Sequence, residues 1–344
     1  MQPDKARAPG VVVLGDVNVD VLAPLDAFPT PGGDFLSPAL QLHCGGVGAN
    51  TALALAKWGV PVRLLSCTGR DWFGDFALRA LQQEGVDVSF VQQTDQTMTG
   101  LIFIAVSPDG QRTMFGSRGA NAAFEVSSET ESCLEGMQAL HLMGYNFLSP
   151  SVTEAAEKLL QQIHQRGAWV SLDVGMAPSN RIRRTILEVA GKVDILFASL
   201  DEAASLTDER DPEKAFAALE QCGAREVVVK LGPRGCLFRE QGKLRQAPPF
   251  PVAAADTTGS GDAFTALFLR ARLLGWSNPE AAVLANAAGA AAASVVGAGA
   301  QMPGPEQVLP LLAGCHLTDE WEPVRARVSE RLSQELRPAA TAGS

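Results

Sequence analysis

Short apolar runs alternate with longer segments whose apolar positions recur at helical spacing. The runs typical of buried parallel strands are 11–14, 62–67, 140–144, 169–173, 195–198 and 227–231. The segments predicted as helices are 73–83, 152–165, 182–189, 201–206 and 213–221. Strands that alternate with helices indicate an α/β fold with a doubly wound, mainly parallel sheet flanked by helices.

Other segments do not fit this alternation. A short strand is expected at 86–91, and strands at 101–106 and 112–116 flank a hairpin turn at Ser107–Gly110. The Pro- and Gly-rich stretch 24–42 precedes them. We expect this hairpin and the 24–42 stretch to form a small β-layer. A closing antiparallel hairpin is expected from 236–238 and 243–246.

The pattern predicts one domain over residues 11–315. Residues 1–10 and about 318–344 are polar or charged, and we expect them to form terminal extensions, the second a surface helix with a frayed end. The Ala-rich stretch near 281–298 is composed of small residues, so it is better explained as a buried helix than as a membrane span.

Composition narrows the classes of partner. The formal net charge is −10, which argues against nucleic acid or an anionic membrane as the main partner. The six cysteines contain no C-x-x-C pair, and the four histidines lack metal-ligand spacing. Neither a zinc site nor a disulfide framework is therefore expected. The start of the chain lacks a signal-peptide pattern, so we expect a cytoplasmic location.

The most informative stretch is the nonapeptide 256–264. Gly259, Ser260 and Gly261 leave backbone N–H groups accessible at the start of an apolar helix that runs to Leu274. A helix N-terminus favours an anion. Asp262 is awkward at such a site unless it acts as a general base while the N–H groups hold a phosphoryl group. The alternative is an Asp that merely caps a helix after a Gly-rich turn.

A second Gly-rich loop, 45–50, also opens a helix. It is not a dinucleotide-binding fingerprint, because Thr51 stands where the third Gly is needed, and no Walker A sequence is present. Asn50 offers a donor and an acceptor to a polyol. Asn18 and Asp20 alternate with valines after the first strand, so both point to one face, as expected of ligand contacts or of an ordinary polar strand end.

The nonapeptide resembles the second signature of the ribokinase-like (phosphofructokinase-B) carbohydrate kinases. The 45–50 loop is similar to their first signature, and the resemblance spans roughly 11–312. It implies transfer of the γ-phosphoryl group of ATP to a hydroxymethyl group. Asp262 would be the base, and the N–H groups of Gly259, Ser260, Gly261 and Asp262 would form the anion hole.

The same resemblance implies the binding residues. The sugar contacts would be Asn18, Asp20, Gly46, Val47 and Asn50. The nucleotide contacts would be Lys230, Gly232, Gly235 and Asn286. A monovalent-cation site, expected to hold K⁺, would use Asp256, the Thr258 carbonyl, and carbonyls near Ala292, Val295 and Gly297.

Three positions depart from the family pattern. Ser199 replaces the amide of the N-x-x-E motif while Glu202 is retained, so weakened or rearranged Mg²⁺ organisation is expected. Val47 and Leu148 stand where ribokinase has polar sugar contacts, which favours a different sugar or a nucleoside. Asp173 is a separate candidate and is not one of these departures. It ends a strand, where it either faces the site or caps the strand end.

Three classes of function remain from the sequence. The first is an ATP-dependent sugar kinase, and the second is a nucleoside kinase, supported by the apolar Val47 and Leu148. The third is a non-catalytic sugar- or nucleotide-binding protein, supported only by Ser199 and opposed by the retained Asp262. The family resemblance also implies that the small β-layer, a β-sheet lid from about 17–42 and 97–118, closes over the site or forms a homodimer interface. An exposed sheet edge there would favour pairing.

Overall fold

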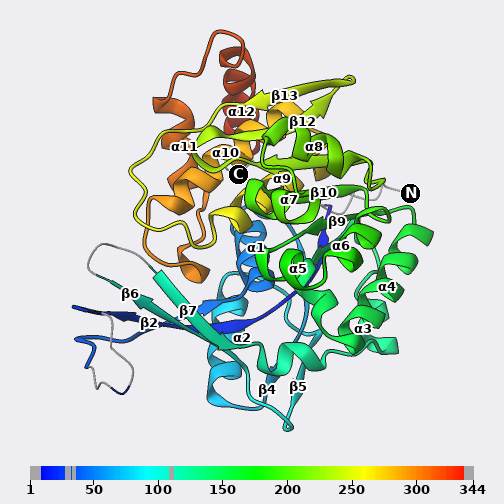
Figure 1. Ribbon diagram of the computed structural model, residues 1–344, viewed down its shortest axis with the longest axis vertical. Coiled ribbons are helices and arrows are strands. Elements are labelled where there is room, and N and C mark those ends of the chain that lie inside the picture. The colour runs from blue at the N-terminus through cyan, green and yellow to red at the C-terminus, as the bar shows by residue number, and fades with distance from the viewer. Residues whose placement is uncertain (1–8, 28–31, 33–35, 108–111, 337–344) are drawn as a thin grey trace, which may run out of the picture.

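The computed structural model describes residues 9–27, 32, 36–107 and 112–336. Its centre is a nine-stranded sheet (Figure 1) in the order β13-β12-β11-β10-β9-β8-β1-β4-β5. The strands are β1 Val11–Leu14, β4 Val62–Gly69, β5 Val91–Thr94, β8 Ala139–Met143, β9 Trp169–Asp173, β10 Ile195–Ser199, β11 Glu226–Lys230, β12 Cys236–Glu240 and β13 Lys243–Ala247. The pairs from β5 to β11 are parallel, and β12 and β13 form an antiparallel hairpin.

A separate four-stranded sheet extends away from the main body (Figure 1), in the order β3-β2-β6-β7. Its strands are β2 Asn18–Pro24, β3 Gln41–Gly45, β6 Gly100–Val106 and β7 Arg112–Ser117. We call this sheet the lid. Its strands come from both predicted lid segments, while residues 28–31, 33–35 and 108–111 of those segments lie outside the described residues.

Helices cover both faces of the main sheet because side chains along each strand alternate between two apolar clusters. Val11 and Val13 belong to one cluster and Val12 and Leu14 to the other. The first face packs against α1 Val47–Lys57, α2 Trp72–Gln83, α9 Ser260–Leu273, α10 Asn278–Ala293, α11 Pro305–Gly314 and α12 Glu322–Glu335. The second face packs against α4 Pro150–Gln165, α6 Arg183–Ala190, α7 Leu200–Thr207 and α8 Pro212–Glu220. The short helix α3 Ser128–Ser132 precedes Cys133 and Leu134, which belong to the same cluster.

The predicted α/β fold with a small β-sheet lid is confirmed. All six cysteines are free. Within the described part of the chain, none of the helices combines the length and apolar composition needed to cross a bilayer. The Ala-rich stretch forms α10, which is buried along most of its length.

One local prediction is wrong, and one is incomplete. The strand expected at 86–91 is β5, at 91–94, because the Asp87 carboxylate accepts hydrogen bonds from the Ser89 N–H and hydroxyl and turns the chain first. Before that turn Asp87 makes a single bridge with Arg63. The helix expected at 182–189 is preceded by a separate helix, α5 Met176–Arg181, and the two are divided at Ile182.

Candidate active site

The two Gly-rich loops meet at the carboxyl ends of the central strands. Each opens a helix, α1 or α9, and these helices pack side by side. Gly48 in the first turn of α1 lies against Gly15 at the end of β1, and a Cβ at Gly48 would stand 2.5 Å from the Gly15 carbonyl carbon. Only glycine permits this approach. It brings the start of α1 over the sheet edge where α/β proteins bind ligands.

A hydrogen bond joins the two loops. The side-chain amide of Asn50 donates to Oδ2 of Asp262 at 2.8 Å. The side-chain oxygen of Asn50 accepts the Gly299 N–H at 3.0 Å. One amide side chain thus connects the start of α1 with the start of α9 and with the loop after α10. Two residues predicted for different roles therefore lie in direct contact.

The first turn of α9 has the geometry of an anion cradle. Gly259 is the N-cap residue and has φ 74°, a left-handed conformation that favours glycine. The Ser260 N–H donates to the Thr257 carbonyl at 3.2 Å. The N–H groups of Gly261 and Asp262 follow in the first turn, where a helix has no partner for them within itself. The N–H groups of Gly261 and Asp262 are thus the donors available to an anion, because the Ser260 N–H already has a partner.

The space beside Gly261 is open toward a lysine. Beyond its chain neighbours and the backbone of its own helix, a Cβ at Gly261 would have Lys230 Nζ, at 3.4 Å, as its sole neighbour within 4 Å among the described residues. An ammonium group and first-turn N–H groups thus lie next to the same space. Phosphate oxygens fit this arrangement, because both kinds of donor favour an anion.

Lys230 is held in a buried network. Its Nζ lies 2.7 Å from Oδ2 and 2.9 Å from Oδ1 of Asp173, and 3.5 Å from the Thr265 hydroxyl. That hydroxyl donates to Asp173 Oδ2 at 2.6 Å. Burial by itself would lower the pKa of Lys230, but Asp173, Glu202 and Asp262 together raise it, so the side chain stays charged.

Asp262 has the electrostatics of a base that works near neutral pH. Burial raises its pKa to about 7, Asn50 and Lys230 oppose that rise, and Asp173 and Glu202 add to it. Such a carboxylate can accept a proton at neutral pH and is a stronger base than an exposed aspartate.

Ser199 and Glu202 form a capping box at the start of α7. The Glu202 Oε2 accepts the Ser199 N–H at 2.7 Å, and the Ser199 hydroxyl accepts the Glu202 N–H at 3.3 Å. Burial raises the pKa of Glu202, and Lys230 opposes the rise. No cluster of three or more His, Cys, Asp or Glu side chains suited to a metal occurs among the described residues. Mg²⁺ that is held through waters and phosphates does not need such a cluster.

The predicted sugar contacts lie on two neighbouring elements. Asn18 and Asp20 are buried on β2, while Gly46 and Val47 are the N-cap and first residue of α1. Asn18 pairs with Gly45 in the lid sheet, and the Asp20 carboxylate packs against Gly45 so closely that any side chain there would collide.

Asn121 orients Asn18. Its side-chain nitrogen donates to the Asn18 side-chain oxygen at 2.9 Å, and its oxygen accepts the Val17 N–H at 2.8 Å and the Ser66 hydroxyl at 3.1 Å. A buried ion pair lies alongside: Arg118 contacts both carboxylate oxygens of Asp16, at 2.7 and 2.8 Å. The segment that follows β7 therefore binds, through Arg118 and Asn121, the residues that connect β1 to the start of β2.

The predicted cation ligands are brought together between α9 and α10. Asp256 is buried, and its oxygens accept the Thr258 N–H at 2.7 Å and the Gly297 N–H at 2.6 Å. The Ala292 carbonyl, at the end of α10, accepts the Val295 N–H at 3.4 Å. Carboxylate and carbonyl oxygens are suitable donors for a hard cation, so the chemistry of this loop fits K⁺.

The predicted nucleotide residues divide into two places. Lys230 faces the start of α9, as described above. Gly235 and Asn286 lie together at the end of β13: Asn286 donates to the Pro248 carbonyl at 3.0 Å, and a side chain at Gly235 would collide with the Ala247 carbonyl. Gly232 has open space around its Cα.

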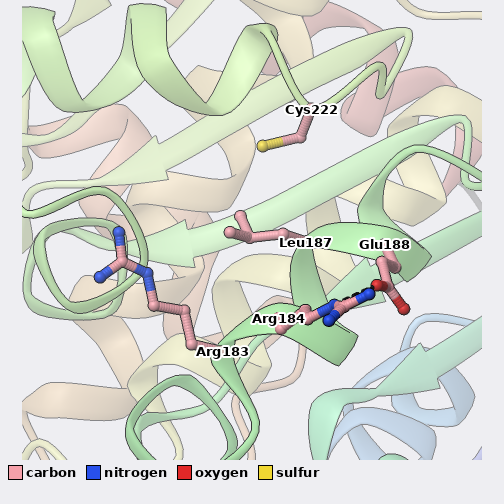
Figure 2. A pocket seen from close by; sticks show the side chains of 5 residues that line it. All are labelled: Arg183, Arg184, Leu187, Glu188 and Cys222. Carbon is pink, nitrogen blue, oxygen red and sulfur yellow. Dashed lines mark hydrogen bonds and ion pairs between the residues drawn. The ribbon is translucent and has the colours of Figure 1, made fainter.

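A surface hollow elsewhere contains none of the predicted site residues. Figure 2 shows it between α6 and the loop after α8, lined by Arg183, Arg184, Leu187, Glu188 and Cys222. Arg184 is paired with Glu188 at 2.7 Å, as the dashed line in Figure 2 indicates. Its exposed ion pair and apolar lining show no convergence of catalytic groups.

Sequence reasoning missed several residues around the two Gly-rich loops, among them Thr265, Asp16 and Arg118. Thr265 was read only as part of an apolar helix, although a lone threonine in such a run is a signal of a buried polar contact. Asp16 continues the alternation of Asn18 and Asp20, and this spacing was available. Arg118 carried no local signal for its pairing with Asp16, which lies 102 positions earlier.

The fold and the paired Gly-rich loops define an α/β kinase architecture, and comparison with known proteins identifies the family. Residues 8–305 match the pfkB family of carbohydrate kinases. The chain is 30% identical over 309 residues to the ribokinase of Haemophilus influenzae, covering 88% of this chain and 98% of that protein.

Solved structures agree with this result. The ribokinase of Arabidopsis thaliana complexed with ribose and ATP has a TM-score of 0.78 and 30% identity, covering 89% of this chain and 99% of that one. An E. coli protein assigned as ribokinase II, in complex with ATP and Mg²⁺, has a TM-score of 0.77 and 25% identity, covering 89% and 100%. The chain belongs to the pfkB carbohydrate kinase family. It is a kinase, a phosphotransferase with an alcohol group as acceptor.

Proposed function

We propose that this kinase transfers the γ-phosphoryl group of ATP to a hydroxymethyl group of a small carbohydrate, with Asp262 as the general base. The observation that carries the proposal is the position of Asp262. It lies in the first turn of α9, hydrogen-bonded to Asn50 from the other Gly-rich loop, with a pKa of about 7. Bound ATP would supply the phosphoryl group, and Mg²⁺ would neutralise its phosphates.

The residues of the chain act on the acceptor as follows. Asn18, Asp20 and Asn50 offer donors and acceptors to sugar hydroxyls, and Gly46 and Val47 form the adjoining wall. Asn50 aligns the Asp262 carboxylate, which accepts the proton of the attacking hydroxyl as its oxygen bonds to phosphorus. Phosphoryl transfer depends mainly on positioning and charge stabilisation, which suits a site built from helix N-termini and one base.

The side of the site that binds the phosphoryl donor uses backbone N–H groups and the ammonium group of Lys230. The N–H groups of Gly261 and Asp262, with Gly259 and Ser260 shaping the turn, stabilise the equatorial oxygens. Gly232, Gly235 and Asn286 line the nucleotide. Glu202, which forms a capping box with Ser199, would help to organise Mg²⁺ and its waters, and a hydroxyl in place of the amide would weaken that organisation.

Two ancillary features complete the proposal. K⁺ would be held by Asp256, Thr258, Ala292, Val295 and Gly297, and would keep the loop before α9 in place. The lid closes on the sugar and pairs with a second copy of the chain. Support for the pairing comes from Phe103 and Phe115, which stack at 5.4 Å and are 42% and 62% exposed.

A coupled ADP-release assay tests the proposed function. The panel should contain pentoses, deoxypentoses, hexoses, deoxy sugar acids and nucleosides, each with ATP, Mg²⁺ and K⁺. Turnover of a sugar supports the proposal. Turnover of nucleosides alone would favour the nucleoside kinase, for which the apolar Val47 and Leu148 are the supporting residues. No turnover of any compound would favour a binding protein.

A further inference from the structure

Lys230 and Asp173 end two strands that flank β10. In the parallel register, Phe197 of β10 stands opposite Asp173, and Ser199 stands opposite Lys230. Lys230 therefore begins two residues further along than Asp173, and its side chain returns across β10 to reach the carboxylate at 2.7 Å. Both side chains are largely buried, with exposed fractions of 14% and 11%.

Thr265 connects this ion pair to the helix above it. Thr265 is fully buried, and its hydroxyl donates to Asp173 Oδ2 at 2.6 Å. It lies four residues after Gly261, so it is on the same face of α9 one turn later. The ends of β9 and β11 are thereby connected to α9 one turn after its start.

The network determines where the ammonium group points. Three oxygens, two from Asp173 and one from Thr265, lie within 3.5 Å of Lys230 Nζ. The same nitrogen is 3.4 Å from the position a Gly261 Cβ would take, on the side where the first-turn N–H groups lie. A lysine is otherwise a flexible point charge that loses much entropy on fixation, so the fixed geometry calls for a role.

We propose that Asp173 and Thr265 are positioning residues that hold the Lys230 ammonium beside the first turn of α9, where it stabilises the phosphoryl group during transfer. The inference rests on the proposed function. The bond from phosphorus to the bridging oxygen of ADP breaks, a bond to the sugar hydroxyl oxygen forms, and the hydroxyl proton moves to Asp262. Lys230 keeps its proton throughout and contributes only charge.

The competing explanation is that Lys230 merely neutralises the buried Asp173. Single substitutions cannot separate the two, because removing one partner of a buried pair leaves the other uncompensated. A charge-free pair can. In Lys230→Met with Asp173→Asn both charges are removed together, and such replacements are often tolerated without loss of stability.

The variants to compare are K230M, D173N and the double variant, with melting temperature and kcat at saturating sugar and ATP measured for each. We expect the double variant to regain most of the melting temperature lost by K230M. Its kcat should stay at least ~10-fold below that of the unaltered protein, on the scale of losing one transition-state contact. Recovery of kcat along with the melting temperature would overturn the inference.

A binding measurement avoids dependence on turnover. Calorimetric titration with ADP and with the non-hydrolysable imido analogue of ATP compares nucleotides with and without the terminal phosphoryl group. The double variant should bind ADP within ~2-fold of the unaltered protein and bind the analogue ~10-fold more weakly, as expected for loss of a charge-assisted contact. Equal changes for both nucleotides, or none, would contradict the assigned position of the ammonium.

Thr265 is tested by its shape-matched substitution. Thr265→Val removes the hydroxyl that orients Asp173 but leaves the ion pair, so kcat should fall several-fold while the KM for sugar stays unchanged. Thr265→Ser should restore kcat. A purely structural role would lower the melting temperature of T265V without that selective loss of kcat.

A matched control lies on the same helix. Arg270, near the end of α9, pairs with Glu335 of α12 at 2.7 Å, also with a largely buried basic side chain. R270M with E335Q should leave kcat and nucleotide preference unchanged. If the unaltered protein turned over no panel compound, the proposed function would fail and this inference with it. Normal turnover with a fully active K230M/D173N variant would overturn this inference alone.

Discussion

The side-chain nitrogen of Asn50 lies 2.8 Å from Oδ2 of Asp262, although the two residues are 212 positions apart in the chain. Each residue comes from a Gly-rich loop that opens a helix, and α1 and α9 pack against each other. The proposed sugar contact and the proposed base thus share one hydrogen bond. Any change in the position of α1 relative to α9 would misalign both.

Asp262→Asn should lower turnover by ~10²-fold or more, because the amide cannot accept the hydroxyl proton. Nucleotide binding should persist, since Asn50 can still donate to the amide oxygen. Because the pKa of Asp262 is raised in the folded state, the folded protein keeps a proton that the unfolded chain releases. The free energy of unfolding of the unaltered protein therefore decreases as pH rises from about 4 to 7.

The variant should therefore melt at pH 8 at the same temperature as the unaltered protein or higher. Steady-state kinetics, calorimetric titration with ADP and thermal denaturation at pH 8 measure the three expectations. A variant that keeps most of its rate would show that another group is the base.

The rate should depend on pH through Asp262. Since the base must be ionised, kcat/KM for the sugar should rise with pH along a limb whose midpoint lies near the pKa of about 7. Asn50 stabilises the charged carboxylate, so Asn50→Ala should move that limb to higher pH in addition to raising the KM for the sugar.

The measurement is the full pH profile of kcat/KM, and Asn180→Ala, which changes an exposed amide on α5, is the control. If the Asn50 variant left the limb unshifted, the limb would not arise from ionisation of Asp262.

Potassium should raise activity above that in a tetramethylammonium buffer of equal ionic strength. The Asp256 oxygens hold the Thr258 and Gly297 N–H groups, so the carboxylate joins the loop before α9 to the loop after α10. Asp256→Asn should reduce turnover and abolish the difference between the two cations. Rates of the unaltered protein that are equal in both salts would remove the cation site from this mechanism.

Self-association should depend on the lid. Phe103 and Phe115 face the same side of paired strands β6 and β7 and are exposed. Phe115→Lys should shift a dimer toward monomer in sedimentation equilibrium, because a charge would be buried in an apolar contact. Leu274→Lys, at an exposed apolar position after α9, is the control and should leave association unchanged. A monomer at all concentrations for the unaltered protein would contradict the prediction.

Most of the fold could be predicted because its signals are local. Apolar runs at 11–14 and 195–198 predict strands from a few neighbouring residues, and glycines before Asp262 predict a helix start from backbone freedom. The strand at 91–94 was predicted too early, at 86–91, because Asp87 and Ser89 form a turn inside a segment where apolar and polar residues alternate as in a strand. Side-chain hydrogen bonds of this kind leave little trace in the hydrophobic pattern.

The chain alone therefore determined the alternation of strands and helices, the two glycine loops and the candidate base, because each depends on periodicity or backbone freedom within about ten residues. Tertiary structure decided which charges meet. Strand order and register bring Asp173 and Lys230 under Thr265, join Arg118 to Asp16, and place Asn50 against Asp262. No local pattern encodes these pairs, since each depends on how distant segments pack.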